Sequence, residues 1–115
     1  MLKLAAVLFA VSALGGLTLA TLHFKKKNLP IPLALLHGLL GAGGLVALLL
    51  ALLGSGFVGA PALAFAIFVV AALGGFLLFS FHLRKRPLPS KLVIIHGLAA
   101  VVAFGILLAA IFAIV

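Results

Sequence analysis

The chain has 115 residues, of which 68% are hydrophobic, and it carries eight basic residues but no aspartate or glutamate. Soluble domains have an apolar share nearer one half, so this composition excludes a soluble globular protein and indicates residence in a lipid bilayer. The absence of cysteine excludes disulfides, thiolate metal sites and cysteine-ligated haem.

Four apolar stretches predict four transmembrane helices, in chain order at about residues 3–24, 32–53, 61–83 and 91–114. Each stretch has the roughly 20 residues that cross a hydrocarbon core of about 30 Å. The first follows Lys3 and resembles a signal peptide, but a later internal stretch repeats it, so we expect it to be retained. We expect no soluble catalytic or nucleotide-binding domain.

Two short basic segments separate the first helix from the second and the third from the fourth. They hold seven of the eight cations, at Lys25, Lys26, Lys27, Arg84, Lys85, Arg86 and Lys91. Such clusters can bind nucleic acid, but in a membrane protein they are typical of cytoplasmic loops. We therefore expect an integral protein of a bacterial inner membrane that binds no nucleic acid. Loops 25–32 and 84–91 would be cytoplasmic, with both termini and the link 54–61 on the opposite side.

The two halves of the chain repeat each other. Residues 22–38 read LHFKKKNLPIPLALLHG and residues 81–97 read FHLRKRPLPSKLVIIHG, which places equivalent positions 59 residues apart. This predicts a duplicated helical hairpin within a single membrane domain, with repeat 1 at about 1–54 and repeat 2 at about 60–115. Because each repeat holds an even number of spans, a pseudo-two-fold axis along the membrane normal relates them. The expected fold is an all-α four-transmembrane-helix bundle.

The boundaries of the first two helices set the depth of the histidines. The two prolines favour a second helix that begins near Pro32. If the first helix continues to about Asn28, His23 and His37 lie at equal depth, and the duplication gives one layer of four histidines. If it ends at Phe24 instead, the layer splits into two tiers. We expect the single layer.

Ionisable groups within transmembrane helices are costly and mark functional sites, although a histidine near a helix end can also rest at the interface. Without carboxylates the chain cannot form a hydrolytic triad or a carboxylate proton relay. Imidazole is the one strong ligand that remains, and it suits zinc, copper, nickel and haem iron. We therefore expect metal ligation by the only histidines of the chain, His23, His37, His82 and His96.

Haem fits these surroundings, since a porphyrin needs imidazole ligands and small residues where it lies against backbone. Small residues occur at helical spacing from the histidines, at Gly15, Gly16, Gly38, Gly41, Gly74, Gly75 and Gly97. They also suit ordinary close packing of membrane helices. The haem propionates would pair with the basic side chains of residues 25–27 and 84–86. One or two haem b groups are the expected cofactor.

The histidine pattern at 23, 37, 82 and 96 in a small helical membrane bundle resembles the small integral-membrane b-type cytochromes, including the cytochrome b561-like proteins. The resemblance implies that histidines on different helices ligate haem. It also implies electron exchange with quinone or another small redox carrier. This chain is much shorter than those proteins and its histidines gather toward one side, so a haem near each membrane face is not implied.

Two questions stay open at the level of sequence. Diagonal pairing, His37 with His96 and His23 with His82, implies one haem and two supporting histidines, whereas pairing between adjacent helices allows two haems. As an enzyme the protein would be at most a quinone oxidoreductase or electron-transfer haem protein. The alternative functions are a structural or assembly subunit of a membrane complex, a path for a metal ion, and a small four-helix transporter. Against the transporter alternative, this chain lacks the membrane glutamate that such transporters use.

Overall fold

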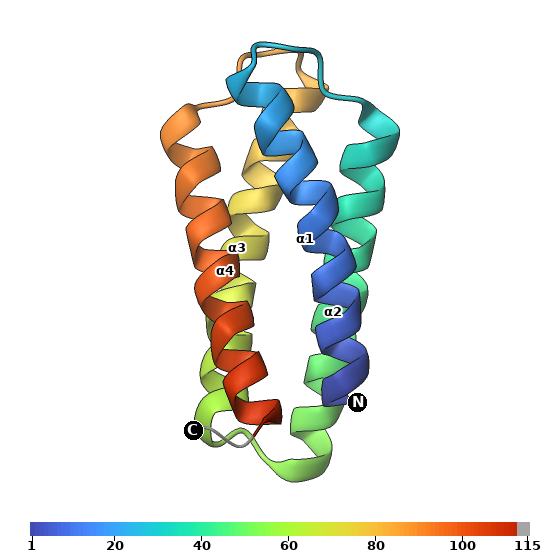
Figure 1. Cartoon of the computed structure of the whole chain (residues 1–115), viewed down its shortest axis with the longest axis vertical. Helices are drawn as coiled ribbons and strands as arrows, with labels where there is room; N and C mark the ends of the chain where they lie inside the picture. The colour runs from blue at the N-terminus through green and yellow to red at the C-terminus, as the bar shows by residue number, and fades with distance from the viewer. Residues whose placement is uncertain (113–115) are drawn as a thin grey trace.

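The computed structural model describes residues 1–112, which form four α-helices and no strand. In chain order these are α1 Leu2–Phe24, α2 Ile31–Ser55, α3 Gly59–Leu83 and α4 Ser90–Ile111 (Figure 1). Each is long and apolar enough to cross a membrane. The predicted all-α four-helix membrane fold is confirmed, and residues 113 and 114 of the predicted fourth helix lie outside the described residues.

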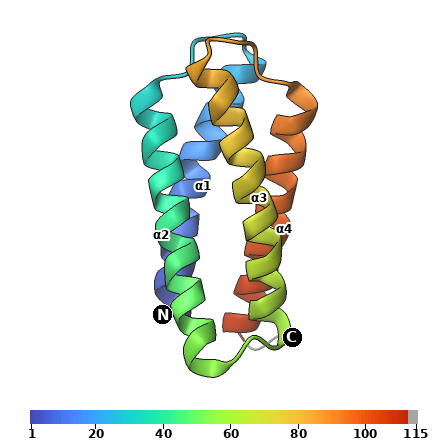
Figure 2. The same ribbon diagram turned by 180° about the vertical axis from the view of Figure 1, so that it is seen from behind.

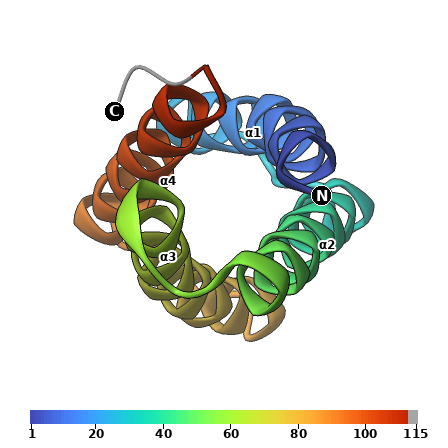
Figure 3. The same cartoon turned by 90° about the horizontal axis from the view of Figure 1, so that it is seen from below.

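The helices stand in a ring in chain order (Figure 3). α1 packs most extensively on α2 and α3 on α4, while fewer contacts join the two hairpins. α1 and α3 therefore occupy one diagonal of the bundle, and α2 and α4 the other. The bundle is 42 Å long, close to the roughly 40–45 Å of a bilayer with its headgroups. Its two ends consequently lie at headgroup level.

Both basic loops lie at the same end of the bundle, which we call the basic end, and the start of α1 and the end of α4 lie at the other (Figure 2). Each basic loop ends the preceding helix in the same way. The amide groups of Lys26 and Lys27 donate to carbonyl oxygens in the last turn of α1, which closes a Schellman motif with Lys26 at φ 57°. Lys85 repeats this after α3 with φ 54°. The expectation that the first helix continues to about Asn28 is therefore wrong, because α1 ends at Phe24.

The second helix of each hairpin begins directly after a proline, and the predicted start of α2 near Pro32 is confirmed. Pro30 is the N-cap of α2, with Pro32 in its first turn, and Pro89 is the N-cap of α4. A proline suits these positions because the first amides of a helix have no intrahelical acceptor to lose.

The closest packing lies in the half of the bundle next to the termini. Phe9 of α1 and Phe68 of α3 stack there, with ring centroids 3.8 Å apart and planes 6° from parallel. Since these two residues are 59 positions apart, they are equivalent in the two repeats and meet on the pseudo-two-fold axis. Gly44 makes room for the Phe9 ring, because a Cβ at Gly44 would lie 2.8 Å from it.

The half next to the basic end is packed more loosely. No residue from 13 to 43 or from 72 to 102 is buried, and α2 and α4 diverge toward this end (Figures 1 and 2). All four histidines belong to this half. The fold therefore places its only histidines in the less tightly packed half of the bundle.

Candidate functional site

His37 of α2 and His96 of α4 come together across the bundle. Their ring centroids are 6.1 Å apart, and the ring planes are nearly perpendicular at 87°. The two residues are 59 positions apart, so they are equivalent in the repeats and lie on the same axis as the phenylalanine stack. Of the two pairings that the sequence allows, the structure thus brings together one diagonal pair, here called the histidine pair.

A hydrogen bond from Nδ1 to a carbonyl oxygen of the neighbouring helix orients each ring of the histidine pair. The Nδ1 atom of His37 lies 2.7 Å from the carbonyl oxygen of Ser12 in α1, and that of His96 lies 2.7 Å from the carbonyl oxygen of Ala71 in α3. A carbonyl oxygen only accepts, so Nδ1 carries the hydrogen and the lone pair of each neutral imidazole lies on Nε2. Metal-ligating histidines are commonly oriented by such a bond.

The Nε2 atoms of the histidine pair remain available. Neither makes a hydrogen bond within residues 1–112. In the same part of the chain, no side-chain nitrogen or oxygen is both fully buried and without a partner. Each Nε2 atom therefore keeps some accessible surface.

The predicted glycine pairs contact these rings from the neighbouring helix. A Cβ at Gly16 would lie 2.8 Å from Cε1 of His37, and one at Gly75 would lie 3.1 Å from Cε1 of His96. Gly15 and Gly74 lie against the Cβ atoms of the same histidines. The sequence does not predict this role, which is to let an imidazole approach the backbone of the adjacent helix.

The remaining predicted glycines have different surroundings. A Cβ at Gly41 would lie 3.4 Å from the Ser12 hydroxyl, so this position receives the serine side chain. Positions Gly38 and Gly97 have no atom within 4 Å of such a Cβ. Contact of any of these glycines with a macrocycle stays a prediction.

His23 and His82 occupy a different tier from the histidine pair. His23 lies one residue before the end of α1, whereas His37 lies six residues into α2, about 9 Å along the helix. The Nε2 atom of His23 lies 3.0 Å from the Ser90 hydroxyl, and Nε2 of His82 donates to the carbonyl oxygen of Leu29 at 3.0 Å.

These bonds tie each hairpin to the other at the basic end. Among the described residues, no three side chains of the histidine, cysteine or carboxylate types form a group that could hold one ion. The expectation of a single layer of four histidines is therefore wrong. The reason is that α1 stops at Phe24, four residues earlier than that layer requires.

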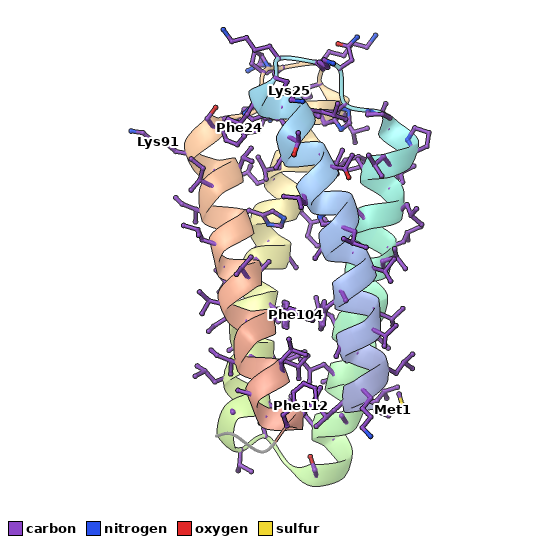
Figure 4. All side chains as sticks on the ribbon, viewed as in Figure 1. Met1, Phe24, Lys25, Lys91, Phe104 and Phe112 are labelled. Carbon is purple, nitrogen blue, oxygen red and sulfur yellow. The ribbon has the colours of Figure 1, made fainter. Side chains whose placement is uncertain are left out.

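The predicted basic residues all lie at the basic end, with Lys25 labelled there in Figure 4. Their side chains are exposed at Lys25, Lys26, Lys27, Arg84, Lys85 and Arg86. Arg84 is the most restrained, because its guanidinium donates to the carbonyl and hydroxyl oxygens of Ser80 and lies 5.1 Å from the centre of the Phe81 ring. The cations therefore form a polar cap over the tier of His23 and His82.

Ser12 is the site residue that sequence reasoning misses. It is 5% exposed, and its hydroxyl donates to the carbonyl oxygen of His37 at 2.9 Å and lies 3.1 Å from Nδ1. The signal was its spacing, since Ser12 precedes His37 by 25 residues, as Ala71 precedes His96. In an antiparallel hairpin such positions face each other across the two helices.

The histidine pair could offer at most two protein ligands to a metal. A bare zinc ion is almost always four-coordinate in structural sites, and the histidine pair offers two nitrogens. Haem iron already has its equatorial nitrogens from the porphyrin and requires axial ligands alone. The ring centroids of the histidine pair are 6.1 Å apart, a separation that is also that of an ordinary edge-to-face contact between two rings.

Comparison with known proteins assigns the chain to no family. It matches no protein-family model, no curated protein and no solved structure. The functional argument therefore rests on the geometry of the histidine pair.

Proposed function

We propose that this protein is a membrane b-type cytochrome that holds one haem b between His37 and His96. The observation that carries the proposal is the meeting of these two rings on the bundle axis, each with Nδ1 bonded to a carbonyl oxygen and Nε2 free. When bound, the haem supplies one-electron redox chemistry at its iron. The chain itself orients the imidazoles and excludes bulk water from the centre of the bilayer.

The packing of the bundle supports one haem rather than two. The half that holds the histidines has no buried residue among positions 13–43 and 72–102, so a planar macrocycle would displace less tightly packed side chains here than in the other half. The other two histidines already use Nε2 in hydrogen bonds. Diagonal pairing leaves His23 and His82 as supporting residues that hold the hairpins together above the haem.

The basic end suits the polar edge of the haem. Lys25, Lys26, Lys27, Arg84, Lys85 and Arg86 have no acidic side chain to pair with anywhere in the chain. Propionates directed to this end would form charge-assisted hydrogen bonds with them. Electrons would pass to or from a quinone or another small carrier that reaches the haem from the membrane.

We further propose that the protein lies in a bacterial inner membrane with its basic loops on the cytoplasmic side. Short basic loops are retained in the cytoplasm because the translocation of lysine and arginine across the inner membrane is disfavoured. The four apolar helices require a membrane, and the seven cations at one end supply the asymmetry.

Absorption spectroscopy tests the haem proposal. Purified from membranes with ample haem, the protein should show the reduced-minus-oxidised spectrum of a low-spin b-type haem. His37→Ala and His96→Ala should each abolish or convert that spectrum, because each removes one axial ligand. A colourless wild-type protein would refute the proposal.

His23→Ala and His82→Ala are the matched controls. They remove the same side chain from the other tier and should leave haem content and spectrum nearly unchanged. If these variants lose haem while His37→Ala and His96→Ala retain it, the assignment of the ligand pair is wrong.

A further inference from the structure

The two seams between the hairpins differ at the basic end. Along the α1–α4 seam, His23 contacts the Ser90 hydroxyl, and Lys91 follows directly in the first turn of α4. In the other repeat, the positions equivalent to Ser90 and Lys91 are Ile31 and Pro32. Only the α1–α4 seam therefore has a cation on both of its helices at this level.

Lys91 heads an apolar stripe on the outside of α4. Ile94, Ile95 and Leu98 follow it at i+3, i+4 and i+7, which places all four on one helix face. Ile94, Ile95 and Leu98 are 48%, 62% and 60% exposed. The stripe thus begins with a charge at headgroup level and continues as apolar surface into the membrane.

The other helix of the seam contributes the same two kinds of surface. Phe24 is 52% exposed at the end of α1, and Lys25 follows it. Figure 4 shows Phe24 on the side of the bundle where Lys91 projects outward. With no aspartate or glutamate in the chain, neither lysine has an acidic side chain of its own protein to pair with.

We propose that the α1–α4 seam at the basic end binds an anionic phospholipid. The headgroup contacts Lys91, and an acyl chain lies along Ile94, Ile95 and Leu98. A phospholipid matches this surface because it joins a negative charge to a long apolar chain, whereas free phosphate or an acidic soluble protein uses the charge alone. The proposal is independent of haem binding.

Native mass spectrometry of the detergent-solubilised protein tests the seam. Dioleoyl phosphatidylglycerol should bind more tightly than dioleoyl phosphatidylcholine. Lys91→Gln should weaken the phosphatidylglycerol affinity about fivefold, as expected for the loss of one lysine at an anionic surface. Lys3→Gln makes the same charge change at the opposite end and should have no effect.

Three outcomes would overturn the proposal. These are equal binding of the two lipids, equal weakening by Lys91→Gln and Lys3→Gln, and displacement of the bound lipid by millimolar inorganic phosphate. The last would identify a site for free phosphate. The haem spectrum of Lys91→Gln should match that of the wild type, so failure here leaves the cytochrome proposal untouched.

Discussion

The two rings of the histidine pair are held alike but not identically. Both donate from Nδ1 to a carbonyl oxygen, yet only His37 also has a serine hydroxyl on its backbone oxygen. Gly41 leaves room for that serine, while the positions equivalent to Gly41 and Ser12 in the second repeat are Ala100 and Ala71. The repeats therefore share the bond that orients the imidazole and differ in the contacts around it.

Gly16 should tolerate no side chain. A Cβ there would lie 2.8 Å from Cε1 of His37, so Gly16→Ala forces the ring to turn and breaks its bond to Ser12. We expect a loss of about 1–3 kcal/mol, the usual cost of overpacking, measured by thermal unfolding in detergent. Gly38→Ala is the control, because nothing lies within 4 Å of its Cβ. Equal stabilities of the two variants would show that the ring does not pack at Gly16.

At the scale of the helices, the termination of α1 and α3 decides where the histidines lie. Lys26 and Lys85 adopt the left-handed conformation that glycine usually supplies. Lysine has no local preference for it, so the sequence offers no stop signal before the prolines. The predicted start of α2 is correct because proline, unlike lysine, has a local preference for this position. Its ring fixes φ at a value that suits the first turn of a helix.

The phenylalanine stack should couple the two hairpins. Phe9→Ala and Phe68→Ala each remove the same contact on the axis, at a cost of roughly 3 kcal/mol. The double variant should therefore lose clearly less than the sum of the single losses. Thermal unfolding checks this, with Phe76→Ala as a control because Phe76 is 71% exposed. Additive losses would mean that the rings stabilise the bundle separately.

For the whole molecule, the distribution of charge governs orientation in the membrane. The chain has no cysteine, so a single introduced cysteine reports on one location. Asn28→Cys in a basic loop should react with an impermeant maleimide only after membrane disruption, and Phe57→Cys in the opposite link should react in intact spheroplasts. Replacing the six cations of residues 25–27 and 84–86 with glutamine should give proteins of both orientations, so that each cysteine is labelled in part in intact spheroplasts. Labelling of Asn28→Cys in intact spheroplasts would contradict the proposed orientation.

The sequence by itself determined the number of helices, the approximate starts of α2 and α4, the duplication and the gathering of cations at one end. These features follow from the hydropathy of local stretches, from the positions of the prolines and from the constant offset of 59 residues between the two repeats. Only the tertiary structure decided which histidines meet. Ring order puts α2 and α4 on one diagonal, and the pseudo-two-fold axis brings equivalent residues together only when they face it, as His37 and His96 do. His23 and His82 instead reach Ser90 and Leu29 of the opposite hairpin, because a left-handed lysine ends each preceding helix before the loop.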